Sequence, residues 1–378
     1  MIRKIHVFAS LGNRKKLPAG GGQTSARRLV KVLENQKYNV SVVNRTVTAY
    51  TSESLYSKFY KCYGYLVDPI RWFFHLLLGK KKDSAILVIG YSGSLFPYYF
   101  LFVRIGKLLG YKTVVYIKGG FTTEKYNRLK QFSKNSYITG LEKTDVALYE
   151  GEEGATISMN VQPDTKAVWI PNYVENGFAP HCFPSKSEDS INLLYFGRIH
   201  YNKNILLIID IFDKLCDKFS NMNLTIIGSG LRNYELEIEK RIKKSPNKDR
   251  IKRLARVSHD DLKTIIDSQH IFVFPSVEAQ EGHSNALNEA MSFGVVPVVS
   301  NNNFLPSIVG NKRLVIDEMT VDEFVRVIED VIESGDYDKL SREMYERVQQ
   351  EFTQSVVEKK LKETLDRVFS GSWVRNDN

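Results

Sequence analysis

The sequence predicts an α/β protein made of two doubly wound parallel-sheet domains. Short apolar runs alternate with helical patterns through both halves of the 378-residue chain, which is the pattern of a doubly wound fold. The chain is also too long for one typical domain and comfortable for two, each with its own core. A stretch rich in Pro, Asn and Ser, residues 173–190, separates the halves and is predicted to be a linker.

Each strand is predicted from a short apolar run bounded by polar or turn residues. In the first half these runs cover residues 3–9, 39–44, 85–89, 113–117, 145–149 and 167–170. In the second half they cover residues 191–196, 223–227, 251–256, 271–274, 296–299 and 313–316. Helical patterns are predicted over residues 25–35 and 96–109, and an amphipathic helix over residues 353–369.

The composition is that of a globular protein. Hydrophobic residues make up 43% and charged residues 25% of the chain, and no apolar run is long enough to span a bilayer. The first ten residues pass directly into a strand without the apolar core of a signal peptide. The three cysteines, Cys62, Cys182 and Cys216, lack the spacing of a metal site. These features predict a cytoplasmic protein that is at most peripheral to a membrane.

Charge is distributed unevenly along the chain. Residues 1–180 contain 26 Lys and Arg against 12 Asp and Glu, whereas the remainder contains 27 against 31. The basic half indicates an anionic partner, either a membrane surface or an acidic acceptor. Residues 55–82 add aromatic side chains and three consecutive lysines, which fits either an interfacial helix on anionic lipid or a packed crossover helix. Nucleic acid is not expected as a partner, because no recognition motif is present.

The richest signal lies in residues 271–300, which read IFVFPSVEAQEGHSNALNEAMSFGVVPVVS. Two apolar runs flank a polar loop and a helix, as in a βαβ unit with parallel strands. Ligands of open α/β sheets bind beyond the carboxyl ends of the strands, so the loop at residues 275–284 is expected to face a crevice.

The helix in this segment can be phased from its own residues. Asn285 and Glu289 point away from the stripe that packs on the sheet. Ser284 or Asn285 is the expected N-cap, and the free N–H groups of the first turn would attract an anion. Glu289 would bind hydroxyl groups beside that anion, or else it is a solvated carboxylate near a favourable helix end. The residues expected on the sheet are Leu287, Ala290, Met291 and Gly294.

Spacing favours a ligand at this helix. Seven residues separate Glu281 from Glu289. The segment around this pair contains, in this order, FPS, EG, Asn285, EAM, G and PVVS. This run resembles the donor-binding motif of the retaining family-four glycosyltransferases of GT-B fold. The resemblance implies that Glu281 contacts the donor sugar and that Glu289 binds the ribose. The residues after Glu281 would present backbone groups to sugar and phosphate, namely Gly282, His283, Ser284 and Asn285.

Two cations lie beside another helix start. A predicted strand ends at Phe196, and Arg198 and Lys203 precede a helix expected from about Asn204. Cations at this end oppose the helix dipole, which indicates an anionic partner; ordinary solvated charges are the alternative. The same family has a Gly-Arg turn and a lysine that grip the donor diphosphate, although Asn204 stands where a glycine is more usual.

The first half carries two further candidates. Gly21 and Gly22, after Gly20, precede a helix expected from about Thr24, where glycines let the backbone approach a phosphate or a sugar. A structural turn is the alternative, because the loop has neither the lysine of a P-loop nor a dinucleotide motif. The resemblance implies a loop that closes over the donor. Lys118, at a strand end, would steady the diphosphate or an acidic acceptor, or it is a surface lysine.

The resemblance also implies domain boundaries. Residues 1–172 would form an acceptor-binding domain, residues 173–190 a linker, and residues 191–352 a domain that binds the nucleotide-sugar donor. Residues 353–378 would form a helix that returns to the first domain, as in the GT-B fold.

Within the first strand, His6 is expected to be a satisfied core residue.

The implied reaction moves a sugar from a nucleotide-diphosphate sugar, UDP before GDP, to a saccharide or polyprenyl-diphosphate-linked acceptor in surface polysaccharide synthesis. Configuration at the anomeric carbon would be retained, with Glu281, Arg198 and Lys203 as catalytic residues and with neither metal nor cofactor. Three alternatives remain open. They are another GT-B enzyme such as an inverting transferase or an epimerase, a dehydrogenase, and a non-catalytic partner that binds sugar nucleotide.

Overall fold

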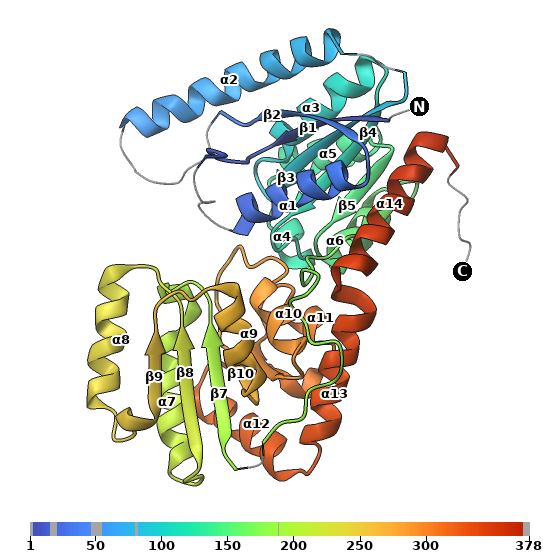
Figure 1. Ribbon diagram of the computed structural model, residues 1–378. Coiled ribbons are helices and arrows are strands. Elements are labelled where there is room, and N and C mark those ends of the chain that lie inside the picture. The colour runs from blue at the N-terminus through green and yellow to red at the C-terminus, as the bar shows by residue number, and fades with distance from the viewer. Residues whose placement is uncertain (1–2, 16–20, 47–54, 80–81, 188, 373–378) are drawn as a thin grey trace. The chain divides into compact units, whose positions relative to one another are not determined.

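The computed structural model describes residues 3–15, 21–46, 55–79, 82–187 and 189–372 (Figure 1). The chain divides into two compact units. Unit 1 comprises Met1–Pro171 and Glu358–Asn378, and unit 2 comprises Asn172–Val357. Each unit is built on a six-stranded sheet whose neighbouring strands pair in parallel. The predicted class of two doubly wound α/β domains is confirmed.

The sheet of unit 1 has the order β2-β1-β3-β4-β5-β6. Its strands are β1 (Lys4–Ala9), β2 (Asn39–Asn44), β3 (Ser84–Tyr91), β4 (Lys112–Lys118), β5 (Val146–Tyr149) and β6 (Ala167–Trp169). Its helices are α1 (Gly21–Asn35), α2 (Leu55–Leu77), α3 (Phe96–Leu108), α4 (Thr123–Asn127), α5 (Gln131–Leu141) and α6 (Glu152–Val161). The last helix, α14 (Gln354–Ser370), belongs to this unit from Glu358 onward.

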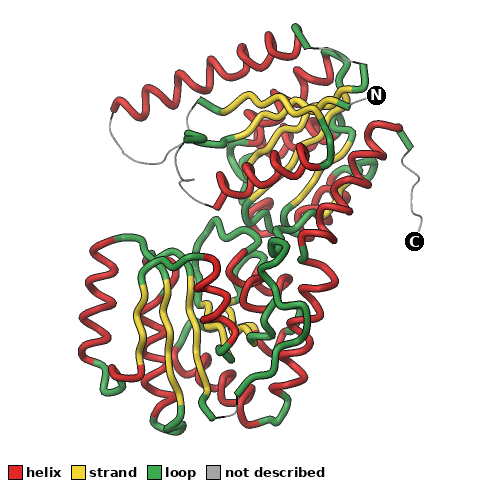
Figure 2. Tube along the Cα trace, in the orientation of Figure 1, coloured by secondary structure: helices red, strands yellow, loops and turns green. Residues whose placement is uncertain are grey.

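Helices cover both faces of this sheet (Figure 2). On one face, the Gln36 side chain at the end of α1 donates to the carbonyl of Glu358 in α14 at 2.9 Å. On the other face α2 and α3 pack together, and the indole N–H of Trp72 donates to the Phe102 carbonyl at 3.2 Å. The strands between them are apolar on both sides, as a parallel sheet requires.

The sheet of unit 2 has the order β12-β11-β10-β7-β8-β9. Its strands are β7 (Ile191–Phe196), β8 (Met222–Ile227), β9 (Ile251–Leu254), β10 (Ile271–Phe274), β11 (Val296–Ser300) and β12 (Val315–Ile316). Its helices are α7 (Ile205–Cys216), α8 (Arg232–Lys244), α9 (His259–Asp267), α10 (Asn285–Met291), α11 (Leu305–Val309), α12 (Val321–Glu333) and α13 (Tyr337–Arg347).

The order of strands in unit 2 reverses between β7 and β10. From β7 the chain proceeds outward to β8, whereas from β10 it proceeds in the opposite direction to β11. The connections that leave the carboxyl ends of β7 and β10 therefore run in opposite directions along the sheet. In open α/β sheets, such a reversal point is where ligands bind.

The observed elements differ from the predicted ones mainly at their ends. α1 begins at Gly21 rather than near Thr24, and β12 is shorter than predicted because a 3₁₀ turn precedes it. α10 ends at Met291, so the prediction that Gly294 shares the packed stripe of this helix is wrong. Gly294 has φ 68° and turns the chain toward β11. No helix in the described part of the chain is long and apolar enough to cross a membrane.

His6 is buried in β1, as predicted, but its ring is only half satisfied. Its Nδ1 lies 2.9 Å from Nε2 of His75 in α2, while its Nε2 has no hydrogen-bond partner. Burial lowers the pKa of His6 to about 4 from an ordinary value of 6.5, and the charges of Lys4 and His75 add to this effect. Unit 1 therefore holds a neutral imidazole at neutral pH.

The His6 environment predicts an acid-sensitive unit 1. The unfolded chain binds a proton at His6 below pH 6.5, whereas the folded chain resists protonation until about pH 4, so stability is lost as pH falls between these values. The loss at pH 5 is about 2 kcal/mol from this group. Denaturant titrations at pH 7.5 and pH 5 should show a smaller loss for His6→Phe than for wild type. An equal loss in both proteins would contradict the assignment.

Candidate functional site

Two loops meet at the carboxyl ends of β7 and β10. The first contains the 3₁₀ turn Tyr201–Lys203, and Asn204 follows it with φ 50°, a left-handed conformation that Asn tolerates well. The Asn204 amide donates to the carbonyl of Pro275 at 2.9 Å, and the Val277 N–H donates to the carbonyl of Asn202 at 2.8 Å. The asparagine that departs from the usual glycine therefore joins the two loops.

Lys203 lies at the centre of this junction and is only 6% exposed. Its Nζ forms an ion pair with the Glu281 carboxylate and donates to the Ser276 hydroxyl at 3.2 Å. The Ser276 hydroxyl in turn donates to Glu281, and Nζ also lies 5.0 Å from the centre of the Phe274 ring. We call Lys203, Ser276 and Glu281 the lysine cluster. Its charges are compensated internally, which is the condition for burying a cation.

Arg198 lies in the loop after β7, which packs closely against the glycine-containing turn after β8. Gly197 has φ 152°, and a Cβ at Gly228 would lie 1.9 Å from the Gly197 carbonyl oxygen. A Cβ at Gly230 would lie 1.9 Å from the carbonyl oxygen of Ile199. Only glycine permits this close approach of the two backbones, so the turn after β8 fixes the loop that carries Arg198.

The Arg198 side chain reaches the same loop as Glu281. Its guanidinium is 60% exposed and pairs with the Glu278 carboxylate at 3.0 Å. The Arg198 carbonyl accepts the phenol of Tyr195 at 3.0 Å. Burial raises the pKa of Tyr195, with a smaller contribution from Glu281, so the phenol remains a donor. The predicted cations Arg198 and Lys203 thus both face acids of one loop.

α10 begins at Asn285, with three residues between it and Glu281. Ser284 is the N-cap, and its hydroxyl accepts the Leu287 N–H at 3.3 Å. Asn285 and Glu289 are half-buried on the side away from the sheet, while Leu287, Ala290 and Met291 are buried, as phased. The side-chain oxygen of Asn285 is buried and has no hydrogen-bond partner. An unsatisfied buried acceptor of this kind suits a donor group from a ligand.

His283 does not present its imidazole to a ligand. The ring is buried, its Nε2 lies 3.0 Å from Oδ1 of Asn288, and its carbonyl accepts the Asn172 amide at 2.7 Å. Asn288 donates back to the Asn172 carbonyl at 3.1 Å. These bonds join the start of α10 to Asn172, the first residue of unit 2. The side chain of His283 therefore has a structural role. Gly282 lies between it and Glu281.

The candidates in the first half of the chain belong to unit 1. Gly21 and Gly22 form the first turn of α1, and a Cβ at Gly22 would lie 2.4 Å from the Tyr91 hydroxyl. Gly20 lies outside the described residues. Lys118 is 2% exposed, so the alternative of a surface lysine is wrong.

Lys118 is held by an internal network at the end of β4. Its Nζ donates to the Ser25 hydroxyl at 2.6 Å and lies 3.5 Å from the Glu150 carboxylate. Glu150 also accepts the Gly119 N–H at 2.8 Å. Burial lowers the pKa of Lys118, and Glu150 opposes this shift. The network ties β4 and β5 to the first turns of α1.

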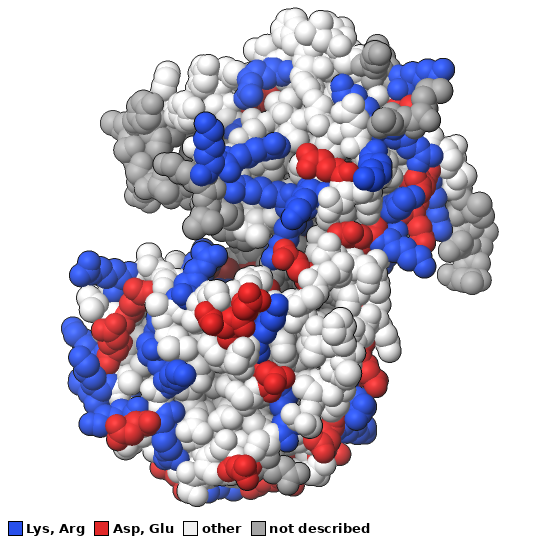
Figure 3. Space-filling model, in the orientation of Figure 1, with Lys and Arg blue, Asp and Glu red and all other residues white. Residues whose placement is uncertain are grey.

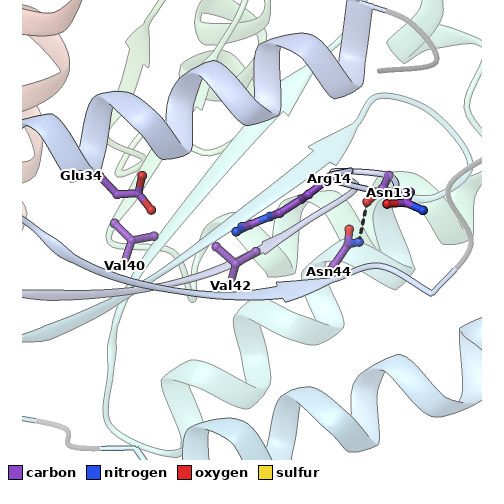
Figure 4. A pocket seen from close by; sticks show the side chains of 7 residues that line it. Asn13, Arg14, Glu34, Val40, Val42 and Asn44 are labelled. Atoms are coloured by element: carbon purple, nitrogen blue, oxygen red, sulfur yellow. Dashed lines mark hydrogen bonds between the residues drawn. The ribbon is translucent and has the colours of Figure 1, made fainter. Parts of the chain in front are cut away.

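Unit 1 also contains a polar groove of about 400 Å³ beside α1 (Figure 4). Arg14 lies along it, with Asn13 and Asn44 near one end and Glu34 at the other. The Asn44 amide donates to the Gly12 carbonyl at 3.0 Å and so holds the loop after β1 in place. Amide, carboxylate and guanidinium groups are the partners that sugar hydroxyls use.

Sequence reasoning missed four residues of these networks. Ser276, Glu278, Asn288 and Glu150 all hold a predicted site residue or its neighbour by a hydrogen bond or an ion pair. Ser276 and Glu278 lie in the loop at residues 275–284, and their position just after β10 is a sequence feature that could have identified them. Asn288 and Glu150 carry no such signal in the sequence. Each is identified only by a contact that folding creates, Asn288 with Asn172 and Glu150 with Lys118.

Most of unit 2 matches a known protein family. Residues 183–351 match the family described as Glycosyl transferases group 1, and this stretch contains the lysine cluster. Most of unit 2 is therefore similar to group 1 glycosyltransferases. The match ends at residue 351, and residues 1–182 lie outside it.

Two curated relatives share part of their sequence with the chain. A stretch of 209 residues is 26% identical to the phosphatidylinositol N-acetylglucosaminyltransferase gpi3 subunit of Schizosaccharomyces pombe, covering 54% of this chain and 44% of that protein. A stretch of 130 residues is 32% identical to O-antigen chain mannosyltransferase B of Escherichia coli, covering 34% of this chain and 33% of that protein. The matched stretches span less than half the length of both relatives.

Solved structures match over almost the whole chain. Sucrose-phosphate synthase from Thermosynechococcus elongatus gives a TM-score of 0.70 at 15% identity, covering 98% of this chain and 100% of that one. Anabaena Alr3699/HepE in complex with UDP gives a TM-score of 0.67 at 12% identity, covering 97% and 100%. These matches establish the GT-B-like fold of the chain.

The close approach at Gly228 predicts a specific loss of stability. Gly228→Ala places a Cβ against the Gly197 carbonyl at a φ of 143°, so it should cost roughly 3 kcal/mol and displace the Arg198 loop. Gly177→Ala is the matched control, since Gly177 has φ 77° with open space around it and should cost only about 1 kcal/mol. Chemical denaturation measures both costs. Equal costs would show that the close approach to Gly197 is unimportant.

Proposed function

We propose that this protein transfers a sugar from a UDP-linked donor to a saccharide or lipid-linked saccharide acceptor, with retention of anomeric configuration. The observation that carries the proposal is the lysine cluster, a buried cation and carboxylate at the point where the strand order of unit 2 reverses. The family match covers this cluster, and the relatives' names describe sugar transfer to a lipid and to an O-antigen chain. UDP is chosen because a structural neighbour was solved with it.

The chemistry of the leaving group explains why cations are needed. The bond between the anomeric carbon and the diphosphate oxygen breaks as a bond to the acceptor oxygen forms, and the acceptor proton passes to the departing diphosphate. Negative charge grows on that diphosphate, so positioned cations lower the barrier. In our proposal the diphosphate replaces Glu281 at Lys203 and recruits Arg198 from Glu278. The released Glu281 carboxylate then accepts hydroxyl groups of the donor sugar, and Glu289 those of the ribose.

The acceptor is proposed to bind to unit 1, whose groove beside α1 offers polar groups for hydroxyls. Lysine and arginine side chains also gather over the face of unit 1 that carries α1 (Figure 3). An acceptor that bears phosphate would be favoured by this charge. Gly21, Gly22 and Lys118 are proposed to contribute to donor binding from this unit, Lys118 through its hold on Ser25 in α1.

A non-catalytic subunit is the second candidate function, because the Schizosaccharomyces relative is itself named as a subunit. Such a protein would bind sugar nucleotide without turnover. Incubation with radiolabelled UDP-sugars and extracted lipid-linked saccharides separates the candidates, and NMR of the product reports its anomeric configuration. A labelled product with the donor's configuration is expected; binding without product would favour the non-catalytic role.

Removal of the cluster's charges should abolish transfer without equal loss of stability. Lys203→Met leaves Glu281 without its cation, so both stability and kcat/KM should fall, the latter roughly 100-fold or more. The double variant of Lys203→Met with Glu281→Gln carries no unpaired charge and should regain stability but not activity. Steady-state kinetics and denaturation of the same preparations provide the measurement.

The control for this experiment is Lys214→Met, which removes an exposed lysine of α7 that pairs with Asp322. Its kinetics should match wild type. Turnover at the wild-type rate in the double variant would refute the role given to the lysine cluster.

We further propose that transfer needs no metal, because Lys203 and Arg198 supply the positive charge that a divalent ion would otherwise provide. Excess EDTA should leave the rate within about twofold of the untreated enzyme. The readout is initial velocity with and without added Mg²⁺ or Mn²⁺. Loss of activity in EDTA that either ion restores would contradict this part of the proposal.

A further inference from the structure

One face of α2 is firmly anchored to unit 1. Trp72 and Leu76 are fully buried, and the Leu76 carbonyl accepts the Tyr111 hydroxyl at 2.7 Å. Asp68 is also fully buried, where it accepts the Tyr98 hydroxyl at 3.0 Å and pairs with Arg71 at 3.1 Å. The orientation of the helix is thereby fixed, and so is the identity of its outward face.

The outward face of α2 is a continuous apolar stripe. Its members recur every three or four residues, so they share one side of the helix. Each is between 47% and 73% exposed. The stripe extends over about 27 Å of helix. Its residues are Phe59, Tyr63, Leu66, Ile70, Phe74 and Leu77. Apolar surface of this extent on a helix in water normally meets a partner.

The neighbouring helix extends the apolar surface. α3 packs beside α2 on the same face of the sheet, and its outward residues include Leu101 and Leu108, the latter 83% exposed. Arg104 stands between them on the exposed side. The outer surface of two adjacent helices is thus apolar and carries a cation.

Charge around the stripe identifies the partner. Residues 55–82 contain six Lys and Arg and a single acid, Asp68, which is buried and paired. Arg71, in the carboxyl-terminal half of α2, and Lys82, which follows the helix in the sequence, are both exposed. Unit 1 as a whole contains 31 Lys and Arg against 15 Asp and Glu, a net charge of +16. A second copy would bring the same positive charge against itself, whereas an anionic lipid surface complements it.

We propose that the stripe on α2 docks unit 1 onto an anionic lipid bilayer, with the helix lying in the plane of the headgroups. Phe, Leu and Ile side chains enter the acyl boundary, tyrosines stay at headgroup level, and the flanking cations contact lipid phosphates. The inference is independent of the sugar-transfer proposal, since it rests on unit 1 alone.

Flotation of the full chain with vesicles tests the docking surface. Wild type should bind vesicles of phosphatidylglycerol and phosphatidylcholine at least tenfold more tightly than vesicles of phosphatidylcholine alone. Leu66→Glu combined with Ile70→Glu should weaken binding to the anionic vesicles at least tenfold. The matched control is Met159→Glu combined with Leu236→Glu, which adds the same charges at exposed apolar positions elsewhere and should bind like wild type.

A second variant keeps the test valid if the double variant folds poorly. Leu66→Trp preserves the apolar character, and its fluorescence should shift to the blue with anionic vesicles only. Equal binding by wild type and the Leu66, Ile70 double variant would overturn the proposal, and so would absence of wild-type binding. A wild-type dimer that becomes monomeric in the double variant would show that a second copy covers the stripe.

Discussion

The site depends on one interaction, the burial of Lys203 against Glu281 at the reversal of strand order in unit 2. A lysine with so little exposure is stable only with a carboxylate and a hydroxyl within reach, and Ser276 supplies the second. This need explains the rest of the local structure. Asn204 joins the two loops at the required spacing, and the glycine turn after β8 holds the neighbouring Arg198 loop. The site thus holds its cation in a charge-compensated form.

Compensation of this kind has a functional consequence. A cation paired with a loop carboxylate can exchange that partner for a phosphate at little net electrostatic cost, because one anion replaces another. In the proposed reaction the exchange also frees the Glu281 carboxylate to bind the donor sugar. Arg198 repeats the arrangement in a more exposed position with Glu278. In the proposed reaction, the two cations exchange their loop carboxylates for the diphosphate of the donor and so bind it from two sides.

The sequence predicted the fold almost completely, because parallel strands are apolar runs and the helices between them are amphipathic. It also predicted that Arg198, Lys203 and Glu281 share one edge, since all three follow strand ends. It did not predict that Lys203 pairs with Glu281, or that Lys118 is buried beside Glu150. Both contacts depend on which strands become neighbours in the sheet. β7 and β10 are adjacent in the sheet but more than seventy residues apart in the chain.

A crystal structure of the protein with bound UDP would show whether the two cations bind a diphosphate. We expect diphosphate oxygens within hydrogen-bond distance of Lys203 Nζ and the Arg198 guanidinium, with Glu281 and Glu278 no longer paired to them. A diphosphate bound elsewhere, with the ion pair between Lys203 and Glu281 intact, would contradict the proposal.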